Sequence, residues 1–231
     1  MEIKMKAVIF DLDGVIADTA KYHFSAWKQL IWNHFGVDIP DTIEANLKGV
    51  SREESLMILL QHIGKTVDEV TFKGLCDEKN RQYMASLANI SKDEILPGIA
   101  LLILDLQKRG IRMALASASK NAPFILEKLG LKSQFYTIID PHQIVAGKPA
   151  PDIFLAAVAA LGCSADECIG IEDSVAGIEA INKAGCISIG VSDEELPEAF
   201  CQVGNTSELS YERLLEVSEQ FHRLKSNCIT K

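Results

Sequence analysis

The chain has 231 residues, 48% of them hydrophobic and 24% charged, which is an ordinary composition for a globular protein with a substantial core. Its formal net charge of −9 argues against nonspecific nucleic-acid binding, which needs a basic face. No apolar run approaches the roughly 20 residues that span a bilayer. The six cysteines form neither a CxxC pair nor a zinc-type cluster with histidine. We therefore expect reduced thiols in a cytoplasmic protein that binds neither nucleic acid nor membrane.

Short apolar runs alternate with helical patterns along the chain. Runs that are apolar throughout are typical of strands buried on both faces of a parallel sheet. The expected strands are 7–10, 112–116, 137–139, 168–171 and 187–191, and the expected helices are 98–109, 122–129, 152–161 and 174–184. This alternation predicts an α/β fold built from right-handed βαβ units, with helices on both faces of the sheet.

A long interruption follows the first expected strand, far beyond an ordinary crossover. It carries amphipathic helical patterns at 20–35, 52–63 and 71–87 and no strand signal. We interpret it as an inserted helical domain over 19–93, with the core domain made of 1–18 and 94–231. Met1–Lys4 is expected to be a loose extension, and the last 25 residues carry no diagnostic pattern.

Polar residues follow the expected strands, at the edge where open α/β sheets bind ligands. They are mainly acids and hydroxyls with one lysine: Asp11, Asp13, Asp18, Thr19, Ser117, Lys148, Glu172, Asp173 and Ser174. Clustered carboxylates repel one another and need a cation or shared protons. Mg²⁺ suits such a set because it prefers oxygen ligands and keeps positions open for water and phosphate. The predicted magnesium ligands are Asp11, Glu172 and Asp173, completed by the Asp13 carbonyl oxygen.

Phosphoryl transfer is the chemistry that fits this edge of the sheet. Lys148 would balance charge on a transferring phosphoryl group, and Ser117 with the amides after it would hold the phosphoryl oxygens. Taken singly, Asp11-Leu-Asp13 could be a solvated turn and Glu172-Asp173 a helix N-cap. Their order and their common position after strands favour the functional interpretation.

Four motifs in this order resemble the haloacid dehalogenase superfamily. They are DLDGVIADT (11–19), the serine at 117 in LASASK, the lysine at 148 in GKPAPD, and Glu172-Asp173 in IGIEDS. The resemblance implies a Rossmann-like core with a mobile helical cap, phosphorylation of Asp11, a general acid/base at Asp13 and a requirement for Mg²⁺. A carboxylate nucleophile is chemically reasonable, because it forms a labile acyl phosphate and divides the transfer into two steps.

Further stretches resemble the β-phosphoglucomutases of that superfamily. They are DTAKYHFSAW (18–27), LKGVSREES (47–55), EKN (78–80), LASASKNAPF (115–124) and KPAPDIF (148–154). The resemblance implies interconversion of β-D-glucose 1-phosphate and glucose 6-phosphate through an aspartyl phosphate and a bound glucose bisphosphate.

The resemblance also implies roles for individual residues. Thr19 would help position Asp13, and His23 would couple Asp13 to cap closure. Arg52 would grip the phosphate that is not being transferred, because a guanidinium binds phosphate through two hydrogen bonds. The other implied substrate contacts are Trp27, Gly49, Val50, Ser51, Ser55 and Lys79 in the cap and Ala118, Ser119, Lys120 and Asn121 in the core.

Alternatives remain at this point. From spacing alone, His23 and Trp27 could be packed helix residues, and Arg52 and Lys79 could be solvated charges. The core motifs are equally compatible with a sugar-phosphate phosphatase, and a non-catalytic sugar-phosphate sensor is a third possibility. In each case the expected partner is a small sugar phosphate, and a monomer is the default expectation.

Overall fold

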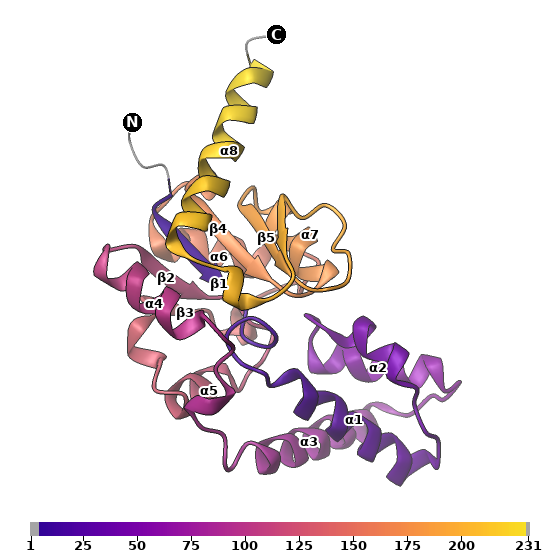
Figure 1. Cartoon of the computed structure of the whole chain (residues 1–231). Helices are drawn as coiled ribbons and strands as arrows, with labels where there is room; N and C mark the ends of the chain where they lie inside the picture. The colour runs from indigo at the N-terminus through magenta and orange to yellow at the C-terminus, as the bar shows by residue number, and fades with distance from the viewer. Residues whose placement is uncertain (1–4, 230–231) are drawn as a thin grey trace.

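A computed structural model describes residues 5–229 and the side chains through residue 227, so the expectation for Met1–Lys4 lies outside the described residues. The core is a parallel sheet with strand order β3-β2-β1-β4-β5-β6 (Figure 1). The strands are β1 (Ala7–Phe10), β2 (Arg112–Leu115), β3 (Thr137–Ile138), β4 (Cys168–Glu172), β5 (Ile187–Val191) and β6 (Cys201–Val203). The first five lie where the sequence predicts them, whereas β6 is an addition at the edge.

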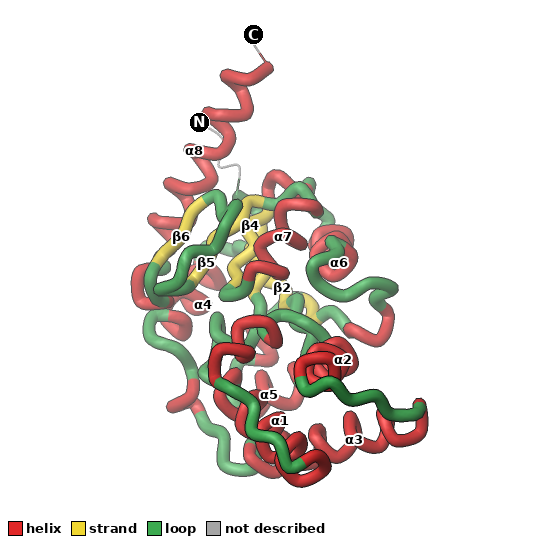
Figure 2. The backbone as a smooth tube through the Cα atoms, turned by 90° about the vertical axis from the view of Figure 1, so that its right-hand side faces the viewer, coloured by secondary structure: helices red, strands yellow, loops and turns green. Residues whose placement is uncertain are grey.

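The sheet is covered on both faces, as the apolar runs require. In β1, Val8 and Phe10 face one apolar cluster while Ala7 and Ile9 face the other, which is the two-residue alternation of a strand. The first cluster is covered by α4 (Ile99–Lys108), α5 (Ala122–Lys128) and α8 (Tyr211–Ile229). The second is covered by α6 (Asp152–Leu161) and α7 (Val175–Lys183), which lie on one side of the sheet in Figure 2.

The long interruption after β1 is helical, as predicted. It contains α1 (Ala20–Phe35), the 3₁₀ helix η1 (Asp41–Leu47), α2 (Arg52–His62) and α3 (Glu69–Ser86). Most of its buried apolar side chains form a third cluster, with Trp27 and Leu30 of α1 among its members. We call residues 19–93 the cap and the remainder the core, although this division into domains stays a prediction.

The chain enters and leaves the cap through two paired linkers. The Asp18 amide donates to the Glu94 carbonyl oxygen at 3.0 Å, and the Leu96 amide donates to the Ile16 carbonyl oxygen at 3.0 Å. Lys21 bridges the same place through ion pairs to Asp18 at 2.7 Å and Glu94 at 3.0 Å. Besides these linkers, the buried side chains of Ala26, Tyr83, Leu87 and Ile90 join the cap to the first core cluster, and further side chains of cap and core meet around a pocket.

The remaining elements were not predicted. Helix α8 packs Tyr211, Leu214 and Val217 into the core cluster and then runs out past the sheet on the side away from the cap (Figure 1). Short 3₁₀ turns are η2 (Lys92–Glu94), η3 (Lys132–Gln134), η4 (Pro141–Gln143), η5 (Ala165–Glu167) and η6 (Thr206–Glu208).

Within residues 5–229, no helix combines the length and apolarity needed to cross a membrane. Unpaired cysteines in the described part of the chain are Cys76, Cys163, Cys168, Cys186 and Cys201, and the Cys228 side chain is outside it.

Candidate active site

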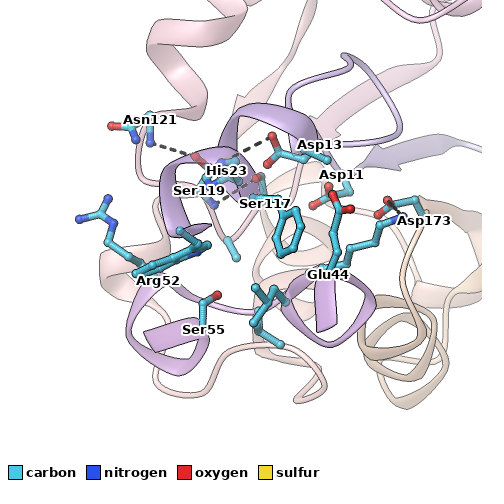
Figure 3. Close-up of a pocket in the computed structure, with 18 of the residues that line it drawn as sticks. Asp11, Asp13, His23, Glu44, Arg52, Ser55, Ser117, Ser119, Asn121 and Asp173 are labelled. Carbon is cyan, nitrogen blue, oxygen red and sulfur yellow. Dashed lines mark hydrogen bonds and ion pairs between the residues drawn. The ribbon is translucent and has the colours of Figure 1, made fainter. Parts of the chain in front are cut away.

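A pocket that opens to solvent lies where the cap meets the carboxyl ends of β1, β2 and β4 (Figure 3), and its empty space, open solvent included, is about 820 Å³. Its core lining is Asp11, Asp13, Ser117, Ala118, Ser119, Lys120, Asn121 and Asp173. Its cap lining is Ala20, His23, Phe24, Trp27, Glu44, Leu47, Lys48, Gly49, Val50, Arg52, Ser55 and Lys79. The rule that ligands bind at strand ends therefore located one wall correctly.

Most residues singled out from the sequence line this pocket. Of those that were given a catalytic, binding or metal role, four do not: Thr19, Ser51, Lys148 and Glu172. Ser51 instead forms the N-terminal capping box of α2 with Glu54, and its hydroxyl accepts from the Glu54 amide at 3.2 Å. That cap fixes the start of α2, whose first residue is Arg52. A direct substrate contact by Ser51 stays a prediction.

Asp11 is held by a buried lysine. Lys148 Nζ donates to Asp11 Oδ1 at 2.6 Å and to Glu172 Oε1 at 2.5 Å, and the Lys148 side chain is 1% exposed. Burial would lower the pKa of Lys148, but the attraction of Asp11 and Glu172 outweighs burial and raises it. The lysine therefore stays charged beside Asp11, where it can neutralise a phosphoryl group.

The Glu172 carboxylate, which accepts from Lys148, is itself fixed by other hydrogen bonds. Its Oε2 accepts hydrogen bonds from the Asp173 amide at 2.8 Å and from the amide and hydroxyl of Ser174, both at 2.9 Å. Both carboxylate oxygens are thus engaged, and the side chain is buried. In this structure Glu172 positions Lys148, and its predicted role as a direct magnesium ligand stays a prediction.

Asp13 lies beside Asp11 with two cap-side neighbours. The Thr19 hydroxyl donates to Asp13 Oδ1, and His23 Nε2 lies 3.8 Å from the same oxygen. Burial raises the pKa of Asp13, and the Thr19 hydrogen bond opposes that rise. A carboxyl group whose protonated form is favoured by burial is suited to donate a proton to a leaving oxygen.

His23 connects Asp13 to a buried lysine of the cap. Lys79 Nζ lies 2.6 Å from His23 Nδ1 and 4.8 Å from the ring centres of both Trp27 and Tyr83. Burial and then the Lys79 charge hold the pKa of His23 well below its usual value. While Lys79 is charged it can only donate, so Nδ1 would accept from it and the neutral ring would carry its proton on Nε2. That Nε2–H has no hydrogen-bond partner among the described residues, and Asp13 is the carboxylate it approaches.

A second polar group lies across the pocket from Asp11. Figure 3 shows Arg52 and Asn121 on one side and Asp11 and Asp173 on the other. Lys120 Nζ, from the loop after β2, pairs with Glu53 of α2 at 2.9 Å. The Ser117 hydroxyl accepts from the Ser119 amide at 3.1 Å, which orders the same loop. Cationic and amide side chains from cap and core therefore line the pocket across from the acids.

Asp173 forms a further contact between core and cap. Lys48 Nζ lies 3.6 Å from Asp173 Oδ2. Burial and then the Glu172 charge raise the pKa of Asp173 to about 7. Next to Lys48, Gly49 has φ +73°, and a Cβ on it would lie 2.3 Å from the Ser174 hydroxyl oxygen. A side chain at position 49 would keep the cap from this approach.

The acids form a donor set that suits Mg²⁺. Burial raises the pKa of Asp11, Lys148 opposes the rise, and Glu172, Asp13 and Asp173 add to it by repulsion. A divalent cation would relieve this crowding, and every donor is an oxygen. Within the described part of the chain, however, no group of three acidic, histidine or cysteine side chains is arranged to hold an ion alone. Backbone oxygen, water and substrate phosphate would have to complete the shell, as is usual for Mg²⁺.

Sequence reasoning missed Ala20, Phe24, Glu44, Leu47 and Lys48, which line the pocket. Glu44 and Leu47 lie in η1, and Lys48 follows it. This 3₁₀ segment has no helical periodicity to mark it. The available signal was the stretch LKGVSREES (47–55), which begins with two of the missed residues.

Comparisons with known proteins agree with this geometry. Residues 5–185 match the family described as haloacid dehalogenase-like hydrolase. A β-phosphoglucomutase of Bacillus subtilis is 44% identical over 222 residues, which are 94% of this chain and 97% of that protein. A phosphorylated carbohydrates phosphatase of Thermotoga maritima is 27% identical, over 78% of this chain and 82% of that protein. The crystal structure of a β-phosphoglucomutase from Clostridium difficile superposes with a TM-score of 0.90 at 40% identity, covering 94% of this chain and 98% of that one.

Proposed function

The chain belongs to the haloacid dehalogenase-like hydrolase family, and from that premise we propose that it is a β-phosphoglucomutase. It interconverts β-D-glucose 1-phosphate and D-glucose 6-phosphate through an aspartyl phosphate and β-glucose 1,6-bisphosphate. The observation that carries the proposal is that two groups of side chains suited to phosphate lie across one pocket: Asp11 with Lys148 on one side, and Arg52 with Asn121 on the other. A substrate with two phosphates needs both.

Asp11 is the proposed nucleophile. Its Oδ1 is tied to Lys148, so Oδ2 is the oxygen that attacks phosphorus, and the bond from phosphorus to the sugar oxygen breaks. Lys148 offsets the negative charge on the phosphoryl oxygens in the transition state, and Ser117 with the amides after it binds those oxygens.

Asp13 is the proposed acid and base. As Asp11 takes a phosphoryl group from the bisphosphate, Asp13 protonates the departing sugar oxygen. In the reverse direction, Asp13 removes the proton from a sugar hydroxyl that attacks phosphorylated Asp11. The Thr19 hydroxyl holds the Asp13 carboxyl in the orientation that both steps need, and the His23 Nε2–H, 3.8 Å from the same oxygen, is the group that would approach it further.

The intermediate must turn over between the two transfers. Phosphorylated Asp11 first donates to the 6-hydroxyl of glucose 1-phosphate, and the bisphosphate then presents its other end. Arg52, Ser119, Lys120 and Asn121, which all line the pocket, are the residues proposed to hold whichever phosphate is not reacting. Lys79, Ser55, Trp27 and the Gly49-Val50 backbone are assigned to the sugar.

Mg²⁺ is part of this proposal. Asp11, Asp173 and the Asp13 carbonyl oxygen would hold it, with Glu172 retained as a predicted ligand. When bound, it supplies positive charge to the transferring phosphoryl group.

Two further expectations are kept. A cytoplasmic location is supported by the free thiols, which fit a reducing compartment. Small sugar phosphates are the proposed partners of a monomeric enzyme.

The test is a paired product assay. Purified enzyme with Mg²⁺ and a trace of β-glucose 1,6-bisphosphate is given the β or the α anomer of glucose 1-phosphate. Glucose 6-phosphate is measured by a coupled dehydrogenase and inorganic phosphate by colorimetry. We expect rapid glucose 6-phosphate from the β anomer, with little inorganic phosphate. One inorganic phosphate released per substrate consumed would identify a phosphatase and overturn the proposal.

A further inference from the structure

Asn80 connects Arg52 and Asn121, the two side chains proposed to bind the phosphate farther from Asp11, and does not itself line the pocket. Its Oδ1 accepts a hydrogen bond from Arg52 Nη2 at 2.9 Å and another from Asn121 Nδ2 at 2.9 Å. Arg52 begins α2, Asn80 lies in α3, and Asn121 precedes α5 in the core. One amide oxygen thus contacts a cap residue and a core residue that both line the pocket.

The identity of the Asn80 atom follows from chemistry. Guanidinium groups can only donate hydrogen bonds, so the Asn80 atom facing Arg52 must be the oxygen. The atom of Asn121 that meets the same oxygen must then be its amide nitrogen. The hydrogen bond from Arg52 therefore determines how the side-chain amides of both Asn80 and Asn121 are oriented.

This geometry leaves the substrate-binding capacity intact. Arg52 has five N–H donors, of which the bond to Asn80 uses one. The guanidinium is thereby oriented while its other donors remain available for phosphate. A bond between a charged donor and an amide oxygen is also stronger than a neutral one.

The bond to Asn121 also depends on the position of the cap. Asn80 belongs to the cap and Asn121 to the core, so the bond exists only when the two are in contact. The neighbouring Lys120–Glu53 ion pair at 2.9 Å crosses the same boundary. Its two side chains are 29% and 43% exposed, so solvent screens this ion pair and its contribution is small.

We propose that Asn80 is a positioning residue that locks Arg52 and Asn121 into one phosphate-binding group when the cap closes. It touches neither the reacting atoms nor the substrate and acts through these two side chains. The inference rests on the proposed function, because it assumes a second phosphate to be held.

The experiment compares Asn80→Leu, which removes the acceptor at similar volume, with Asn80→Asp, which keeps an acceptor oxygen. The matched control is Asn46→Leu, the same change at an exposed cap asparagine outside the pocket lining. Each enzyme is assayed for mutase flux from β-glucose 1-phosphate. Each is also assayed for phosphorylation of Asp11 by acetyl phosphate, a donor with no second phosphate. Arg52→Ala and the double variant Arg52→Ala/Asn80→Leu complete the set.

We expect Asn80→Leu to lower kcat/KM for mutase flux roughly tenfold, about 1.4 kcal/mol, with KM rising more than kcat falls. Phosphorylation by acetyl phosphate should stay within about twofold of wild type. Asn80→Asp should recover most of the loss, and Asn46→Leu should match wild type. On the Arg52→Ala background, Asn80→Leu should have little further effect, because it acts through Arg52.

Several outcomes would overturn the role of Asn80. Unchanged flux in Asn80→Leu would do so, as would equal losses in both assays or losses that multiply with Arg52→Ala. If Asn80→Leu does not fold, Asn80→Ala takes its place. The proposal is then contradicted if the mutase flux of Asn80→Asp is no higher than that of Asn80→Ala. A wild-type enzyme without mutase flux refutes the proposed function instead, and that result is obtained before any variant is compared.

Discussion

Lys79→Met should make the protein more stable and less active. The Lys79 side chain is 1% exposed and lies between the Trp27 and Tyr83 rings, with its Nζ against His23 Nδ1. Burial and then the Arg52 charge lower the pKa of Lys79 from 10.5 to about 7. Methionine has a similar length and flexibility without the charge, so it should fill the same space.

The size of the gain follows from proton linkage. Between pH 7 and 10.5 the unfolded chain binds a proton at Lys79 that the folded chain lacks, so stability rises with pH. At pH 7 and below, a pKa shift of this size opposes folding by at most about 5 kcal/mol. The two aromatic rings offset part of that while the lysine is charged. We therefore expect Lys79→Met to gain roughly 2 to 5 kcal/mol at pH 7, declining to less than about 1 kcal/mol at pH 10.

The assay is urea unfolding followed by tryptophan fluorescence, at intervals from pH 7 to pH 10. Lys65→Met is the control, because it makes the same change at an exposed cap lysine. Mutase flux of Lys79→Met should fall at least about tenfold, since His23 loses the group that fixes its tautomer. A stability difference that does not vary with pH, or a destabilised variant, would refute the reasoning.

Three further changes test other parts of the site. Asp11→Asn should lower mutase flux by at least about 10⁴-fold and abolish labelling by a phosphoryl donor, as seen by intact mass; residual phosphoenzyme would contradict the nucleophile assignment. Arg52→Ala should reduce mutase flux far more than phosphorylation of Asp11 by acetyl phosphate, and equal losses would show that Arg52 does not hold the distal phosphate. Gly49→Ala and Gly64→Ala both place a side chain at positive φ, each costing about 1–2 kcal/mol of stability. Only Gly49→Ala should reduce kcat/KM, because its Cβ would overlap Ser174 while nothing lies within 4 Å of position 64.

The sequence predicted the sheet well where strands were apolar on both faces. β1, β4 and β5 are buried throughout and were placed to within one residue. β6 was missed because only Val203 of its three residues is buried, and its pairing with β5 is a long-range contact. Helix α8 was missed for a related reason. It has an apolar face, but no motif in it indicated that this face packs on the sheet.

The site was predicted as a set of residues, but its internal connections were not. Strand-end placement brought Asp11, Lys148 and Glu172 to one edge. It could not indicate that Glu172 would direct an oxygen to Lys148 rather than to the pocket, because that depends on how the turn after β4 donates its amides. Likewise, Asn80 lay inside a recognised stretch, yet its double hydrogen bond exists only once α2, α3 and the loop after β2 are assembled.

The proposed chemistry and the proposed phosphate recognition both depend on contacts between cap and core. Asp13 belongs to the core, but the His23 that approaches it is held by Lys79 of the cap. Arg52 belongs to the cap, but through Asn80 it is tied to Asn121 of the core. With the cap open, phosphorylated Asp11 would be exposed to water. Asp13 would lack the nearby His23, and no group would hold a second phosphate. With the cap closed on a sugar phosphate, both groups would be complete and bulk water largely excluded. The same core that serves phosphatases can therefore favour a sugar hydroxyl over water through these contacts.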